Sequence, residues 1–160
     1  DSAMLAAELG LPYAVALFIN PGFDPRIARW YLQNFRPTEA QPRPELILAM
    51  NVLCADSDEQ AQAMTRAADI TYLRFLRRQG EVEVCSPEEA ATYVFSPEES
   101  AFVRGASAAR AVGTPAVVRG RVREFAQAYG ATEVMAVCNT FHFRDRLRSF
   151  ELLASAFAAD

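Results

Sequence analysis

The stretch that decides the fold is Leu46-Ile-Leu-Ala-Met-Asn-Val-Leu-Cys54, which runs directly into Ala55-Asp-Ser-Asp-Glu-Gln60. The first part is an apolar run of strand length and predicts a buried strand. In the second part, Ser57 is followed three residues later by Gln60, the spacing of a capping box, and the acidic residues suit the positive end of a helix dipole. A buried strand that passes at once into a helix is the repeating unit of a parallel α/β fold.

The same alternation extends to both ends of the chain. Apolar runs at 13–19 and 133–138 predict two more strands, and the first of them should be central in the sheet and buried on both faces. Right-handed crossovers should join these parallel strands. Apolar residues at helical spacing predict the helices that surround them, at 2–9, 25–36, 57–78, 114–129 and 144–157.

The segment at about 81–112 interrupts this alternation, and we expect it to be an insertion of short helices. It contains Ser86-Pro-Glu-Glu89 and Ser96-Pro-Glu-Glu99. In each tetrapeptide the serine is predicted as the N-cap, the proline as the first helical residue, and the second glutamate as the residue that reaches back to the cap. Capping gives every residue a role, so it is favoured over phosphorylation of the two Ser-Pro pairs.

Composition limits the classes of protein and partner. The chain has 160 residues, of which 51% are hydrophobic and 22% charged, with a net charge of -4, a balance typical of a soluble globular protein. This charge argues against nucleic acid as a partner, and the longest apolar run is too short to span a membrane. A single histidine and three widely separated cysteines form no spacing typical of a metal site or a disulfide framework. We therefore expect a reduced, cytoplasmic protein.

Candidate site residues follow from where parallel α/β folds bind ligands, beyond the carboxyl ends of their strands. This rule selects Ser2, Asn20, the loop 54–57 and the loop 139–142. Ser2 is the strongest candidate because a hydroxyl and free N–H groups at a helix N-terminus can bind an anion. An ordinary N-cap serine is the alternative interpretation.

A catalytic pair of Cys138 and His142 is disfavoured. The two residues are four positions apart across a strand-to-helix turn, which gives their side chains no reason to meet. We expect Cys138 to be a small buried residue and His142 to lie on the surface near a helix start. Three arginines of the last helix, Arg144, Arg146 and Arg148, are expected on a solvated face. The alternatives for one of them are contact with an anion or an ion pair with Asp145 or Glu151. The residues by themselves therefore support an α/β domain with an anion-binding helix terminus.

Five motifs, which together cover nearly the whole chain, carry a family resemblance. They are Ser2-Ala-Met-Leu-Ala-Ala-Glu-Leu-Gly-Leu-Pro-Tyr-Ala14, the segment from Tyr31 to Pro37, the segment from Asn51 to Glu59, Gly113-Thr-Pro115, and Glu133-Val-Met135 with Arg146-Leu-Arg-Ser149-x-Glu151-Leu-Leu-Ala154. In this order they resemble the bacterial-luciferase-like family of flavin-dependent monooxygenases.

The resemblance implies a fold. The family has a (β/α)8 barrel, and such barrels need about 250 residues. Residues 1–160 would then form one partial barrel domain, the C-terminal half, with the strands 13–19, 46–54 and 133–138 as its sixth, seventh and eighth. The start at Asp1 rather than methionine is expected for a processed chain or a fragment.

The resemblance also implies a function. Members of this family are oxidoreductases that oxidise an organic substrate with dioxygen through reduced FMN, while some use a deazaflavin, and a separate flavin reductase is implied as a partner. Ser2 matches the position whose hydroxyl contacts the flavin phosphate, and Asn20, Asn139 and Thr140 would lie on the pocket rim. No catalytic residue is assigned, because the resemblance implies that most of the pocket belongs to strands upstream of Asp1. Ala16-Leu-Phe18 stands where many relatives have a histidine, which argues against a proton-transfer role at that position.

An alternative of a different class is a truncated, non-catalytic chain that acts as a flavin-binding or assembly module. A half barrel leaves the edges of its outer strands unpaired and exposes apolar surface. We therefore expect it to aggregate, to form oligomers or to require its missing half. An unrelated α/β fold is disfavoured by the ordered motifs.

Overall fold

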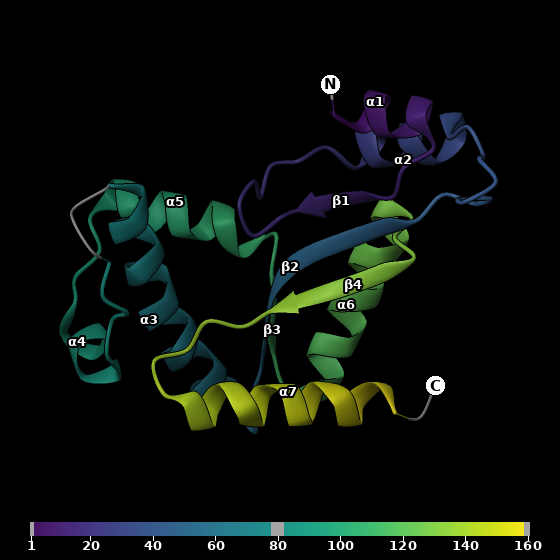
Figure 1. Cartoon of the computed structure of the whole chain (residues 1–160). Coiled ribbons are helices and arrows are strands. Elements are labelled where there is room, and N and C mark those ends of the chain that lie inside the picture. Colours follow the sequence, from purple (N-terminus) through teal and green to yellow (C-terminus); the bar gives the residue numbers. More distant parts are fainter. Residues whose placement is uncertain (1, 78–81, 159–160) are drawn as a thin grey trace. The chain divides into compact units, whose positions relative to one another are not determined.

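The computed structural model describes residues 2–77 and 82–158 (Figure 1). Their helices and strands follow one another in the predicted order, with an insertion of short helices before the last helix–strand–helix segment. The chain forms two compact units, Asp1–Asn51 with Arg121–Val137 and Val52–Gly120 with Cys138–Asp160. Strand β2 (Leu46–Cys54) and helix α6 (Pro115–Tyr129) contribute residues to both units.

The first unit is built on parallel strands. Strand β2 pairs in parallel with β1 (Tyr13–Ala16) and with β4 (Glu133–Val137). Parallel neighbours need a crossover connection, and α2 (Pro25–Asn34) provides it between β1 and β2. Helix α1 (Ser2–Leu9) packs against α2, as Figure 1 shows.

Helix α2 begins as predicted and anchors this unit. The carboxylate of Asp24 accepts a hydrogen bond of 2.8 Å from the backbone N–H of Arg26, and Pro25 takes the first helical position. Further along the helix, the Tyr31 side chain is fully buried, with its ring centroid 5.3 Å from that of Tyr13 in β1. Capping therefore sets the start of α2, and aromatic packing holds it against the sheet.

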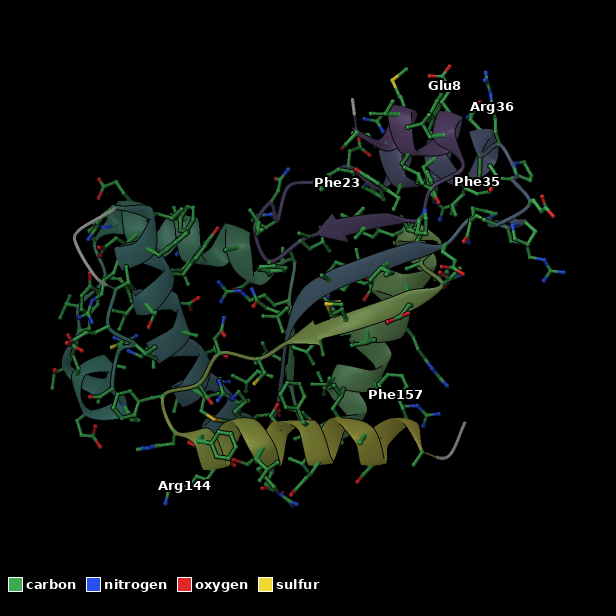
Figure 2. The ribbon with its side chains drawn as sticks, viewed as in Figure 1. Glu8, Phe23, Phe35, Arg36, Arg144 and Phe157 are labelled. Carbon is green, nitrogen blue, oxygen red and sulfur yellow. The ribbon has the colours of Figure 1, made fainter. Side chains whose placement is uncertain are left out.

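Helix α1 ends at a close approach of two backbone segments. Gly10 has a φ of +64°, and a Cβ atom there would lie 2.5 Å from the carbonyl oxygen of Arg36. Only glycine adopts this conformation without strain and leaves room for the carbonyl. The side chains of Glu8 and Arg36 also meet, with Oε1 and Nη2 3.8 Å apart (Figure 2).

The two faces of the β1–β2–β4 sheet are covered to different extents. Paired residues of parallel strands point to the same side, and side chains alternate along each strand. On one face Leu46, Leu48 and Met50 are fully buried. The opposite face, called the open face below, is only partly covered: Met135 is 52% exposed there, and Ala49 is its one buried member. The open face consists of Ala14, Ala16, Ile47, Ala49, Asn51, Glu133, Met135 and Val137.

The second unit contains the end of β2 and the helices that follow it. Ser57 caps α3 (Asp58–Leu76) by accepting a hydrogen bond of 3.2 Å from the backbone N–H of Gln60. A short strand that the sequence did not predict, β3 (Ala111–Gly113), pairs in parallel with the last residues of β2. Helix α7 (Phe143–Phe157) is the last helix of the chain.

The insertion contains α4 (Pro87–Thr92) and α5 (Pro97–Ser107) and is attached to α3 by both charged and apolar contacts. Asp69 of α3 forms an ion pair with Arg110, and only 6% and 9% of the two side chains are exposed. The apolar contacts involve Ala67, Ile70, Cys85 and Ala90, with Tyr93 and Phe95 packed against them.

Both Ser-Pro-Glu-Glu repeats begin helices as predicted, but only the second forms a complete capping box. Ser86 and Ser96 each accept a backbone hydrogen bond of 3.2 Å from the residue three positions on. Glu99 reaches back to the N–H of Ser96 at 2.7 Å, and this bond holds the pKa of Glu99 below its usual range. The Glu89 carboxylate pairs mainly with the Arg74 guanidinium of α3, and its interaction with the backbone of Ser86 is the weakest of the contacts that lower its pKa.

The prediction of a central strand at 13–19, buried on both faces, is wrong. Strand β1 ends at Ala16, whose carbonyl accepts hydrogen bonds of 3.1 and 3.0 Å from the N–H groups of Ile19 and Asn20 and so closes a turn. Ala14 is exposed, and Ile19 is 67% exposed. Within the described residues β1 pairs only with β2, which makes it an edge strand.

The other boundaries lie close to their predicted positions. Strand β2 matches 46–54, and β4 is one residue shorter than 133–138. The helices differ from their predicted ends by up to two residues, and the end predicted at 78 lies outside the described residues. None of the helices in 2–77 and 82–158 is long and apolar enough to cross a membrane.

Candidate functional site

Ser2 lies in the first unit, in the first turn of α1. The helix begins at Ser2 itself, so Ser2 is a helical residue and not the cap that the sequence predicted. The residue is exposed, and its Oγ lies 3.3 Å from the phenolic oxygen of Tyr13. The first N–H groups of a helix have no acceptor within the helix and carry a positive partial charge. An exposed hydroxyl beside them can bind an anion such as phosphate.

Asn20 also lies in the first unit, directly after the turn that ends β1. Its backbone N–H donates to Ala16, and its carbonyl accepts a hydrogen bond of 3.2 Å from the N–H of Phe23. In the described part of the chain, no residue forms a hydrogen bond with its side-chain amide. The exposed amide of Asn20 is therefore available to a ligand at the carboxyl end of β1.

Asn139 and Thr140 lie in the second unit, in the loop before α7. The Thr140 hydroxyl donates a hydrogen bond of 3.0 Å to the carbonyl of His142, so it stabilises the loop. Asn139 is exposed. His142 precedes α7 without a side-chain capping bond, and its ring packs edge-on against Phe141 at 5.0 Å between centroids. Of these residues, Asn139 has the side chain most accessible to a ligand.

Buried Ser149 of α7 contacts two cysteines, Cys54 at the end of β2 and Cys138 directly after β4. Its Oγ accepts a hydrogen bond of 2.9 Å from the backbone N–H of Cys54. Burial raises the pKa of both the Cys54 and the Cys138 thiol, although a hydrogen bond with Ser149 opposes this for Cys138. A buried, protonated thiol is a poor nucleophile. The predicted burial of Cys138 is confirmed, and Ser149 has a structural role here.

Arg148 of α7 forms a bidentate ion pair with Asp56, with nitrogen–oxygen distances of 2.7 and 3.1 Å. The hydrogen bond lowers the pKa of the Asp56 carboxyl. Arg148 Nη1 also lies 3.5 Å from Glu151 Oε2, and Arg144 Nε lies 3.7 Å from Asp145 Oδ1, so two of these arginines pair with the carboxylates that the sequence offered as alternative partners. Figure 2 shows Arg144 pointing away from the second unit.

Each unit by itself presents exposed polar side chains that can bind a ligand by hydrogen bonds. Within 2–77 and 82–158, no three histidine, cysteine or acidic side chains are arranged to hold a metal ion. The exposed hydroxyl and amide side chains donate and accept hydrogen bonds, which suits a phosphate or a polar organic group. Such groups position a reactive cofactor, which would then carry the chemistry.

Asn51 is a polar residue of the open face that the predicted site left out. It lies inside β2, where the residues on either side of it are Met50 and Val52. The signal in the sequence was a single amide within an apolar run. The apolar run 46–54 predicts a buried strand. Only the pairing of β2 with β4 shows that its side chains alternate between two unlike faces of the sheet.

Known proteins match this chain along almost its whole length. No protein-family model matches it. A luciferase-like monooxygenase from Escherichia coli (strain K12) is 30% identical over 94% of this chain and 45% of its own length. The structure of apo-MsnO8 is 33% identical with a TM-score of 0.79, over 99% of this chain and 48% of that one. A third structure shares the fold with a TM-score of 0.57 and 17% identity, over 99% of this chain and 45% of that one. It is a type II Baeyer-Villiger monooxygenase, the oxygenating constituent of 3,6-diketocamphane monooxygenase from Pseudomonas putida, in complex with FMN.

The parallel strands and their helices match luciferase-like relatives over about half of those relatives' length, which is consistent with a partial α/β barrel. The chain is a relative of the luciferase-like monooxygenases, and the resemblance that the five motifs predicted is confirmed. It spans about half the length of the curated relatives it matches.

Proposed function

We propose that this chain belongs to a flavin-dependent monooxygenase of the luciferase-like type, which oxidises an organic substrate with dioxygen and reduced FMN. The supporting observation is the β1–β2–β4 sheet with Ser2 at the start of α1, in a chain of which 94% matches 45% of a luciferase-like monooxygenase. One structural neighbour is a complex with FMN. A deazaflavin in place of FMN is the alternative cofactor.

The residues at the start of α1 fit the phosphate of FMN. Ser2 presents an exposed hydroxyl at the positive end of the helix dipole, and from Ser2 onward the described first turn contains no acidic residue. We propose Ser2 as the phosphate-binding residue of the first unit, with Asn20 as a rim residue there. In the second unit, taken by itself, we propose Asn139 and Thr140 as rim residues, as the resemblance implies. The flavin, when bound, supplies the oxidation chemistry, and this chain binds and orients it.

Substitution of Ser2 tests the proposed phosphate site. The dissociation constants of FMN and of riboflavin, which lacks the phosphate, are measured for the chain by quenching of flavin fluorescence. We expect Ser2→Ala to weaken FMN binding about tenfold, the loss typical of a hydrogen bond to a charged group, and to leave riboflavin binding unchanged. The control Ser2→Thr keeps the hydroxyl and should bind FMN as the wild type does. Binding of neither flavin by the wild type would contradict the proposal.

Partners and location are further proposals. A separate flavin reductase would supply reduced FMN, and the three buried free cysteines support a reducing, cytoplasmic location. Association with other chains through the edges of β1 and β4 is proposed because each strand pairs only with β2 among the described residues.

The second candidate function is a flavin-binding or assembly module without turnover. The unpaired strand edges and the open face favour it, because both are surfaces that another polypeptide could cover. Oxygen consumption with chemically reduced FMN and a panel of aldehydes and ketones separates the two candidates. Substrate-dependent oxygen uptake supports the monooxygenase, whereas flavin binding without product supports the module.

A further inference from the structure

We infer that Asn51 is a flavin-binding residue whose amide hydrogen-bonds the imide edge of the flavin ring. This inference rests on the proposed function. It concerns the ring of the cofactor, whereas Ser2 is assigned to the phosphate. Both residues lie in the first unit, so the argument needs nothing from the second.

The position of Asn51 in the sheet is the first step. Asn51 pairs with Val137, the last residue of β4. Theirs is the last pair between β2 and β4. Its side chain therefore lies on the open face at the carboxyl end of β4. Ligands of parallel α/β folds bind at this end of the strands. A side chain that lies on a partly covered face at this end is placed to contact a ligand.

The surroundings of Asn51 are the second step. Its neighbours on this side of the sheet are Ala49 in the same strand and Val137 in the adjacent strand, and Leu53, two residues further along β2, is apolar too. Glu133, the other polar member of this face, is the first residue of β4 and so lies at the opposite end of the sheet. One amide on an otherwise apolar surface suits a flat ligand with an apolar body and a polar edge.

The third step is that nothing in the described structure explains the amide. Asparagine is disfavoured in strands, where apolar β-branched residues pack better. Asn51 is only partly buried, and no described residue forms a hydrogen bond with its side chain. Residues that break a local preference without a compensating contact are found mainly at functional sites. An apolar residue would suit β2 better unless a ligand uses the amide.

Chemical complementarity identifies the part of the ligand. The side-chain amide presents one acceptor and two donors in a plane. The imide edge of a flavin presents a carbonyl, an N–H and a second carbonyl in a row, so an amide can form two hydrogen bonds with it side by side. Apolar members of the open face, such as Met135, would contact the body of the ring. The amide would fix the orientation of the heterocycle against the sheet.

Two substitutions test the inference by ligand binding. Asn51→Leu replaces the amide with an apolar group of similar size, and Ile47→Leu, on the amino-terminal part of the same face, is the matched control. We expect Asn51→Leu to weaken FMN and riboflavin alike, by about tenfold, the loss expected for one or two neutral hydrogen bonds. Ile47→Leu should leave both affinities within twofold of the wild type. Thermal unfolding of both variants checks that the fold is kept.

A modified ligand shows whether the contact is with the imide. N3-methylriboflavin lacks the N–H donor of this edge, so it should bind the wild type more weakly than riboflavin does, and Asn51→Leu should no longer distinguish the two. The inference would be overturned if the wild type and the Asn51→Leu variant discriminated equally between riboflavin and N3-methylriboflavin. It would also be overturned if the Asn51→Leu variant bound flavins as tightly as the wild type does. In both cases the proposed function would stand if FMN still binds the wild type. Failure of the wild type to bind any flavin would overturn both.

Discussion

Asp69 and Arg110 form the most deeply buried ion pair among the described ion pairs, and their chemistry makes them sensitive to substitution. Burial raises the pKa of Asp69, and the positive charge of Arg110 opposes this shift. A buried ion pair adds little net stability over an apolar pair, because both charges lose their water. Loss of one partner is different, since it leaves the other charge buried without compensation.

Asp69→Asn should therefore destabilise the second unit strongly. We expect a decrease of about 3–5 kcal/mol in the free energy of unfolding, the range for a buried charge whose partner is removed. Urea unfolding followed by circular dichroism measures it. The control Glu124→Gln removes the carboxylate of the more exposed Arg121–Glu124 pair and should cost less than about 1 kcal/mol. Similar losses in the two variants would show that Arg110 is solvated when Asp69 is neutral.

At the scale of elements, the two Ser-Pro-Glu-Glu repeats show how tertiary contacts alter a local motif. Both serines cap their helices, yet Glu99 completes a capping box while Glu89 pairs with Arg74. Because Ser96 holds Glu99 in its ionised form, the folded pKa of Glu99 lies below its unfolded value. The box is therefore fully stabilising above the unfolded pKa, and this stability is lost as pH falls through the folded pKa.

Ser96→Ala and Ser86→Ala should each destabilise their helix by about 1 kcal/mol at neutral pH, because each removes the hydroxyl that caps the helix. Hydrogen exchange of the amides of α4 and α5 measures both losses. Glu99→Gln instead removes the carboxylate that accepts from the backbone N–H of residue 96, a bond that Ser96→Ala keeps, so its loss should shrink as the pH is lowered below the unfolded pKa of Glu99. A loss from Glu99→Gln that is constant from pH 7 to 3 would contradict a role for the ionised carboxylate.

The sequence predicted most of the elements, and it failed where residue types do not signal how the backbone turns or pairs. Ranges such as 46–54 follow from local patterns of apolar residues and caps. The apolar run at 13–19 could not reveal that β1 turns away after Ala16, because the turn depends on backbone hydrogen bonds and not on a turn motif. Strand β3 was missed because Ala111–Gly113 is short and lacks a strand pattern.

The candidate site was predictable only in part, for a similar reason. Ser2 and Asn20 follow from the rule that ligands bind beyond strand ends, and both are exposed in the structure. Asn51 could not be placed until the register of β2 with β4 assigned it to the open face. The pair of Asp56 and Arg148 joins residues 92 positions apart, a separation for which a single sequence gives no signal.

At the scale of the whole molecule, the chain presents surfaces that a complete barrel would cover. The strands β1 and β4 each pair only with β2 in the described part, and the open face carries Met135 with 52% of its surface exposed. Unpaired strand edges and exposed apolar surface both favour association with another polypeptide. The relatives are about twice as long, so their remaining residues are available to cover such surfaces.

Association of the purified chain should therefore depend on the open face. We expect its apparent mass in sedimentation to rise with protein concentration, and Met135→Lys to shift this rise to higher concentration, because a charge on the face must lose water when the face is covered. Met4→Lys is the matched control: Met4 is also 52% exposed, but it lies on α1 and outside the sheet. If both substitutions reduce association equally, the apolar residues of α1 contribute as much as the sheet does. A chain that stays monomeric at all concentrations would show that its open strand edges are protected in solution, and the expected association would be wrong.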